Sequence, residues 1–344
     1  MKSFVRKLTA GATAIAFIAT AFGAQAQQIK LTLADQNSPT AWGPANALTP
    51  WVKQVEDATK GRVKLEVYPS QTLVKGIDMW RGVRSGIADI GWCVQSYWPD
   101  QTPLSDVIGL PGLPISSAEK GSEALWKAYE KFPAMQKEYG DIVPLVLWTA
   151  TPFFVLTAKK QVKTLDDLKG MKIRVVGGPS IAWAKSIGAV PTPMPMPDVY
   201  QALERGVIDA AGTPWEAVVG FRLFEVGQYY SVLPLAVAYF SLCANRAKWN
   251  SLPADVREQI MSVSGLAGSK FWGKNFFDSA EKEVYTRAKA ANRPIDRYDF
   301  PPEELAKFRK SAEPQWEAWV KQMEGKGHKE AREILNFVVQ TLQN

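Results

Sequence analysis

The chain has 344 residues, with 41 lysines and arginines against 34 aspartates and glutamates, and a formal charge of +7. This length is sufficient for two domains, and no basic run of the kind that follows nucleic-acid phosphates occurs, so nucleic acid is not an expected partner. The single histidine, His328, excludes an HExxH zinc site and a catalytic triad with an internally placed histidine.

Residues 1–26 have the features of a cleavable signal peptide. Basic residues at 2–7 precede a small, apolar stretch at 8–22, and Ala24-Gln25-Ala26 forms an A-x-A cleavage site. The stretch is too short for a membrane anchor, and no second run of about 18 apolar residues follows. We therefore predict export to a bacterial periplasm, with a mature chain that starts at Gln27.

The first half of the mature chain alternates strand-like and helix-like segments, which predicts α/β layers. The expected strands are 29–34, 62–68 and 88–94, and the expected helices are 48–55 and 79–86. We assign residues 27–149, together with 237–275, to a first α/β domain.

The second half repeats this order. The expected helices are 164–170, 180–187 and 198–205, and the expected strands are 172–176, 207–210 and 295–300. Prolines at every second position from 191 to 197 are tolerated only in an edge strand or an extended crossover. Residues 256–290 lack proline and are expected to form one or two long helices. We assign 150–236 and 276–344 to a second α/β domain, and the absence of a linker implies more than one crossing between the domains.

The two cysteines, Cys93 and Cys243, both lie in apolar, strand-like runs. An oxidising compartment permits a disulfide between them, but the apolar surroundings favour two buried thiols, which is the expectation here.

Signatures of an enzyme are scarce. The chain has no G-x-S-x-G, no P-loop and no G-x-G-x-x-G after a strand. Residues 117–120 match S-x-x-K without its S-D-N and K-T-G companions. Catalysis by paired carboxylates has no fixed spacing and stays open, but we expect a protein that is not an enzyme, with no cofactor and no metal.

Arg174 lies in the middle of an apolar strand, near its carboxyl end. A buried arginine needs an anionic partner, and two are possible. One is an ion pair with Asp209 on a neighbouring strand. The other is a ligand carboxylate, which a guanidinium holds with two parallel hydrogen bonds. Gly177, Gly178 and the start of the next helix add backbone donors nearby, which suits an anion.

Five segments, in this order, resemble solute-binding proteins of tripartite ATP-independent periplasmic (TRAP) transporters, the DctP-like family. They are GRVKLEVYPSQTLVKG (61–76), GIADIGW (86–92), VKTLDDLKGMKIRV (162–175), MPDVYQALERGVIDAAGTPWEAV (196–218) and NRAKWNSLPADVREQI (245–260). The resemblance covers most of the mature chain. It implies an α/β periplasmic-binding-protein fold, with two α/β domains around a ligand cleft and a long helix that spans both.

The resemblance also implies site residues. Arg174 matches the arginine that holds the substrate carboxylate in this family, and Thr213 stands where many relatives have an asparagine that orients the ligand. Phe153 lies in the apolar stretch 150–154, where sugar-acid binders carry a second polar contact. These departures argue against sialic acid and C4-dicarboxylates. Trp215 matches a ligand-contacting position in some relatives.

Aromatic residues are expected to form the rest of the pocket, since the chain has 13 tryptophans. Ring stacking and burial would then supply much of the affinity. Glu216 either caps the following helix or, as in some keto-acid-binding relatives, joins a cation that bridges to the substrate. The remaining candidates for ligand contact are Trp42, Trp92, Gln95 and Trp148.

The predicted function is a periplasmic receptor that captures an organic acid with an apolar or aromatic body and closes around it. By resemblance, its partners are the small and large membrane subunits of a TRAP permease. A monomer is the default expectation, while some relatives dimerise through a C-terminal helix. The alternatives are a carboxylate-based hydrolase or lyase, or a ligand sensor, on the same scaffold.

Overall fold

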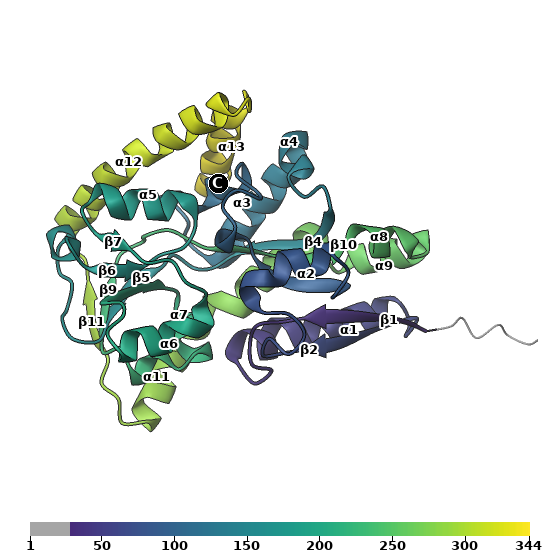
Figure 1. Ribbon diagram of the computed structural model, residues 1–344, viewed down its shortest axis with the longest axis horizontal. Helices are drawn as coiled ribbons and strands as arrows, with labels where there is room; N and C mark the ends of the chain where they lie inside the picture. Colours follow the sequence, from purple (N-terminus) through teal and green to yellow (C-terminus); the bar gives the residue numbers. More distant parts are fainter. Residues whose placement is uncertain (1–27) are drawn as a thin grey trace, which may run out of the picture.

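The computed structural model describes residues 28–344, so the predicted signal peptide lies outside the described part. Figure 1 shows two β-sheets side by side, with helices packed around each. The predicted architecture of two α/β domains is confirmed.

The first sheet has the strand order β2-β1-β3-β10-β4. Its strands are β1 (Ile29–Ala34), β2 (Val63–Tyr68), β3 (Ile90–Val94), β4 (Ile142–Thr149) and β10 (Tyr239–Asn245). β1 runs parallel to β2 and β3, while β10 is antiparallel to β3 and β4. Alternation in β2 buries Val63 and Leu65 on the face that meets the apolar side of the first helix.

The second sheet has the order β11-β9-β5-β8-β6-β7. Its strands are β5 (Phe154–Thr157), β6 (Lys172–Arg174), β7 (Val190–Pro191), β8 (Ala210–Thr213), β9 (Tyr229–Val232) and β11 (Asp296–Asp299). The proline-rich segment supplies the edge strand β7, as its spacing predicts. The strand expected at 207–210 begins at Ala210 instead, because residues up to Asp209 form the turn after the preceding helix.

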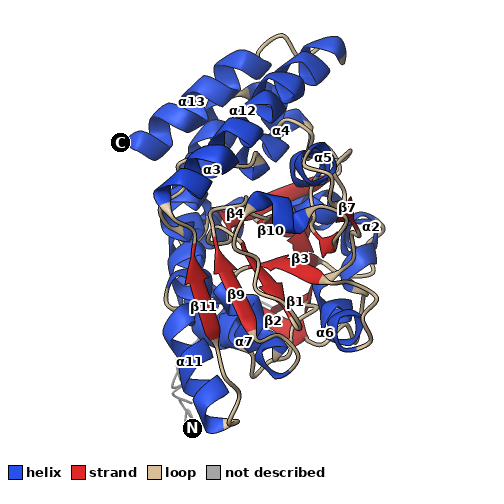
Figure 2. Ribbon diagram, turned by 90° about the vertical axis from the view of Figure 1, so that its left-hand side faces the viewer, coloured by secondary structure: helices blue, strands red, loops and turns tan. Residues whose placement is uncertain are grey.

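Helices cover the outer faces of both sheets (Figure 2). They are α1 (Thr49–Ala58), α2 (Met79–Arg84), α3 (Ala118–Lys131), α4 (Pro133–Lys137), α5 (Gly178–Ser186), α6 (Met196–Glu204), α7 (Trp215–Gly220), α8 (Arg246–Ser251), α9 (Ala254–Ser262), α10 (Gly265–Trp272), α11 (Ala280–Ala290), α12 (Pro302–Gly325) and α13 (Ala331–Gln343). None of these helices is both long and apolar enough to cross a membrane.

The chain crosses between the sheets several times. After β4 and before β10, two extended segments pair through hydrogen bonds from Ala150 N–H to Ala238 O and from Phe153 N–H to Ala236 O, at 2.9 and 2.8 Å. The third crossing is a nearly continuous helix. In it, α10 packs on α3 and β4, the π-helical segment η7 (Gly273–Asp278) follows, and α11 packs on α7. This is the expected helix that spans both domains.

The last helices contact the first domain, although the predicted boundaries assign them to the second. α12 starts beside α5, where Trp183 Nε1 donates to Ser311 Oγ at 2.9 Å. Farther along, Trp316 Nε1 and Trp319 Nε1 donate to the carbonyl oxygens of Pro111 and Pro103. The apolar side of α13 then packs on α3, within the core beside the first sheet.

The expectation of two buried thiols is wrong, because Cys93 and Cys243 form a disulfide. β3 and β10 are neighbours in the sheet, with Ser241 opposite Cys93 and Cys243 opposite Gly91. The two cysteines are therefore diagonal neighbours on adjacent strands, with Cα atoms 6.5 Å apart. The sequence could not show this pairing, since 150 residues separate them.

Candidate ligand-binding site

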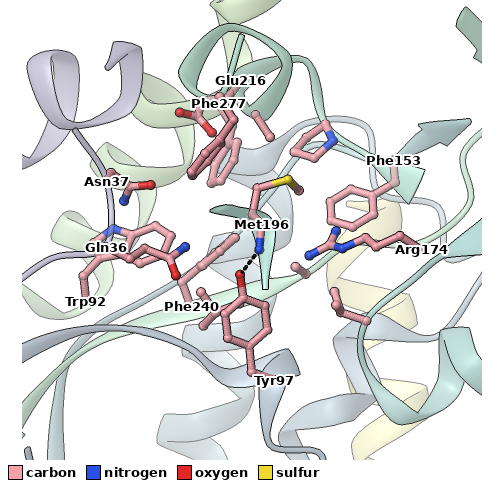
Figure 3. Close-up of a pocket in the computed structure, with 16 residues that line it drawn as sticks. Gln36, Asn37, Trp92, Tyr97, Phe153, Arg174, Met196, Glu216, Phe240 and Phe277 are labelled. Carbon is pink, nitrogen blue, oxygen red and sulfur yellow. Dashed lines mark hydrogen bonds between the residues drawn. The ribbon is translucent and has the colours of Figure 1, made fainter. Parts of the chain in front are cut away.

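A cavity between the two sheets lies where two pairs of parallel strands end, β1 and β3 in the first sheet and β6 and β8 in the second. Gln36 and Asn37 follow β1, Tyr97 follows β3, Arg174 ends β6 and Glu216 follows β8; all five line the cavity (Figure 3). Ligands of open α/β sheets gather at the carboxyl ends of strands. The fold therefore brings polar side chains from both domains to one place.

Arg174 is buried at this cavity with only 2% of its surface exposed. Its Nε donates to the carbonyl oxygen of Met194 at 3.2 Å, and its Nη1 donates to that of Gly212 at 3.1 Å. Within residues 28–344 no carboxylate forms an ion pair with it. Burial lowers the pKa of the guanidinium from its ordinary value, which is the expected response of a cation without a counter-charge.

Asp209, the alternative partner of Arg174, is engaged elsewhere. Its Oδ2 accepts a hydrogen bond from the backbone N–H of Lys172 at 2.9 Å. The ion-pair interpretation therefore has no support in the structure, and the guanidinium keeps donors for another acceptor in the cavity.

Aromatic rings enclose the remainder of the cavity. They belong to Trp92, Tyr97, Phe153, Phe221, Phe240 and Phe277. Only about 30 Å³ of the cavity is open to the centre of a water molecule. The free space between the domains is therefore small, and its lining is mostly apolar.

Two buried carboxyl groups lie at the boundary of the domains. Burial raises the pKa of Glu216 to about 8, partly offset by a hydrogen bond from the backbone N–H of Gly43, and nearby Asp35 raises it further. Burial also raises the pKa of Asp35 to about 7. Within residues 28–344, no group of three or more histidine, cysteine, aspartate or glutamate side chains is placed to hold a metal ion.

The sequence profile of the family described as bacterial extracellular solute-binding protein, family 7 (DctP), matches residues 37–322. The chain belongs to this family. The predicted role as a solute-binding protein of TRAP transporters is thereby confirmed. Proteins of this family act outside the cytoplasm, which agrees with the predicted export.

Three proteins are similar to this family 7 protein over almost its whole length. A Comamonas testosteroni protein named outer membrane transporter protein TsaT is 28% identical over 94% of this chain and 95% of its own. The TRAP solute-binding protein of Rhodoferax ferrireducens T118, solved with copurified benzoate, is 28% identical with a TM-score of 0.86, over 92% of this chain and 98% of its own. A marine metagenome TRAP protein described as specific for aromatic acids, solved with 3-hydroxybenzoate, is 27% identical with a TM-score of 0.85, over the same shares.

The sequence of this family 7 protein predicts nine site residues. Four of them line the cavity: Arg174, Trp92, Phe153 and Glu216. The other five lie around it. Thr213 and Trp148 are fully buried, the latter among the rings of Trp92, Phe240 and Trp272.

The remaining three also pack outside the cavity lining. Trp215 stacks on Tyr230, with ring planes 6° apart, inside the second domain. Gln95 donates to Ser241 Oγ at 2.6 Å. Trp42, from the first domain, packs on the core of the second. A contact of these five side chains with ligand stays a prediction.

Three polar lining residues, Gln36, Asn37 and Tyr97, are not among the predicted site residues. Gln36 and Asn37 directly follow a predicted strand, so the rule for strand ends could have identified them. Phe240 and Phe277 gave no such signal, because an aromatic residue in an apolar run looks the same in a core and in a cleft.

Proposed function

We propose that this protein binds a small aromatic monocarboxylate, holds the carboxylate with Arg174, and delivers the closed complex to a TRAP permease. The observation that carries the proposal is a fully buried guanidinium whose free donors face an aromatic cavity and which no carboxylate of the described chain neutralises. Leaving a buried charge without a partner costs several kcal/mol. A ligand carboxylate offsets that cost.

The shape and lining of the cavity support an aromatic body for the ligand. Trp92, Phe153, Phe240 and Phe277 provide ring faces and edges, which interact favourably with another ring. The relatives solved with benzoate and 3-hydroxybenzoate cover almost the whole chain and support the same ligand class.

We further propose that the mature protein starts at Gln27, acts as a periplasmic monomer and performs no chemistry on its ligand. The family relationship to binding proteins supports a receptor. Recovery of an unchanged ligand after prolonged incubation, measured by chromatography, is the expected result. Conversion of the ligand would favour the alternative of a carboxylate-based enzyme.

Thermal unfolding of the mature protein with a panel of acids tests the ligand class. The panel contains benzoate, phenylacetate, cyclohexanecarboxylate, galacturonate and succinate, with neutral benzamide as the control for the carboxylate. A ligand at about 100 times its Kd adds about 2.7 kcal/mol of stability, which raises Tm by several degrees in a chain of this size. We expect the aromatic acids to raise Tm by several degrees and benzamide to leave it unchanged.

Arg174→Met tests the anchor, because methionine retains length and apolar bulk without the charge. Arg205→Met is the matched control, since Arg205 is an exposed arginine of the same domain. We expect the ligand-induced shift to vanish in Arg174→Met and to persist in Arg205→Met. Equal shifts in both variants would show that Arg174 does not bind the carboxylate. A shift with galacturonate or succinate alone would overturn the aromatic class.

A further inference from the structure

One end of the cavity is a cluster of hydrogen-bond donors. Arg174 uses Nε and Nη1 for backbone carbonyls and has further N–H groups to offer. The Tyr97 hydroxyl accepts from the backbone N–H of Met196 at 2.8 Å, so its own proton can be donated. This end suits the carboxylate of the ligand.

The other end of the cavity offers acceptors. Asn37 donates through Nδ2 to Asp35 Oδ1 at 2.7 Å, which fixes the amide and leaves its side-chain oxygen for the cavity. Glu216 is only 4% exposed, and its Oε1 has no hydrogen-bond partner. Figure 3 shows both side chains on the side of the cavity away from the Arg174 guanidinium, with Met196 and aromatic rings between.

These acceptors constrain the ligand. A buried acceptor without a donor costs about 1–3 kcal/mol, and a plain hydrocarbon ring cannot supply one. A second carboxylate is also disfavoured, because burial at this end of the cavity already opposes the charged forms of Glu216 and Asp35. A neutral hydrogen-bond donor on the ligand's ring would satisfy these acceptors.

We infer that the preferred ligand is an aromatic acid with a hydroxyl or amino group on the part of the ring away from its carboxylate, and that Glu216 and Asn37 accept the hydrogen bond from that group. The inference rests on the proposed function, because it takes the carboxylate to be bound at Arg174. It deepens that function by naming Glu216 as the residue that determines specificity.

Isothermal titration of the mature protein with a matched ligand set tests the inference. The set contains benzoate, 3- and 4-hydroxybenzoate, their methyl ethers, which retain the oxygen but cannot donate, and isophthalate. We expect one hydroxybenzoate to bind about ten- to a hundredfold more tightly than both benzoate and its own methyl ether. Isophthalate should bind more weakly than benzoate.

Two variants assign the preference to Glu216. In Glu216→Met the acceptor is removed at similar length, so benzoate should still bind while the advantage of the hydroxyl falls to within about threefold. In Glu216→Gln the side chain gains N–H donors. The affinity for the methyl ether should therefore rise relative to the affinity for the hydroxybenzoate. The second variant keeps the test decisive where the first does not fold.

The outcomes separate this inference from the proposed function. Equal affinities for benzoate, the hydroxybenzoates and the methyl ethers in the wild type would overturn the inference and leave the aromatic-acid function standing. Affinity for benzoate that requires Na⁺, with the requirement lost in Glu216→Met, would also overturn it, because the acceptors would then serve a cation. No binding of any aromatic acid would overturn the proposed function itself.

Discussion

The Tyr97 hydroxyl and the Met196 backbone N–H form a hydrogen bond of 2.8 Å that joins the two domains beside the ligand cavity. Tyr97 follows β3 of the first domain, and Met196 begins α6 of the second. Because the bond joins the two domains, parting them would break it. A second interdomain bond, from the Gly177 N–H to the Ser96 carbonyl oxygen at 3.1 Å, lies nearby.

Tyr97→Phe should weaken the closed complex without changing either domain. The hydroxyl accepts from the Met196 N–H and can donate to the ligand carboxylate, and each hydrogen bond contributes about 0.5–1.5 kcal/mol. The Kd for the best aromatic acid should therefore rise about twofold or more, as measured by isothermal titration. Tyr200→Phe is the control, because the Tyr200 hydroxyl bonds Glu225, at 3.1 Å, within the second domain. Equal losses of affinity in both variants would contradict a role in closure.

Arg174 should hold the ligand-free protein open. Its two carbonyl partners, on Met194 and Gly212, belong to its own domain and should persist on opening, whereas opening should return the guanidinium to water. Small-angle X-ray scattering should show a larger radius of gyration for the ligand-free wild type than for its complex. Ligand-free Arg174→Met should be closer to the compact form. A ligand-free wild type as compact as its complex would exclude this effect.

Binding of benzoate near neutral pH should take up protons. In the closed structure the pKa of Glu216 is raised to about 8 from an ordinary value of 4.5, and that of Asp35 to about 7 from 3.8. Raised values mean that closure favours the protonated forms. This stabilisation is complete below the ordinary values and is fully lost once the pH has passed about 8, so affinity should decrease from about pH 4 to about pH 8.

Titrations at pH 7 in buffers of different ionisation enthalpy measure this proton uptake. In Glu216→Gln the proton uptake should be smaller, because only Asp35 still contributes to it. Observed heats that do not depend on the buffer would contradict the coupling between closure and these two carboxyl groups.

Removal of the disulfide should lower stability and leave affinity nearly unchanged. Cys93 and Cys243 close a loop of 150 residues, and loss of such a link costs about 2–5 kcal/mol. Neither sulfur lines the cavity. The double variant Cys93→Ala/Cys243→Ala should therefore show a lower denaturation midpoint with the same Kd. Free thiols in the denatured, unreduced wild type would show that the link is absent.

Local patterns were sufficient to predict the strands and helices around the site. β-branched residues flanking Arg174 identified β6, and the regular prolines identified the edge strand β7. The start of β8 was misplaced because Val207 and Ile208 are apolar but lie in the turn, where Val207 is 53% exposed. Apolar character alone does not distinguish a strand from the turn that leads into it.

The site was harder to predict, because its composition depends on how two domains face each other. Arg174 was identifiable as a charge in an apolar strand. Trp215 looked equally suitable at a strand end, but the first turn of α7 directs its ring onto Phe154 and Tyr230. The Tyr97 hydroxyl bonds Met196 of the other domain, a contact that no pattern within either segment indicates.

The position of β10 between β3 and β4 has a consequence for the order of folding. The strands of the second sheet from β5 to β9 are contiguous in sequence at 154–232, whereas the first sheet needs residues 239–245 to join its two parts. The nested domain can thus form while the outer one still has an open edge. Contacts of such long sequence separation form slowly. The disulfide between Cys93 and Cys243 links that late strand to β3.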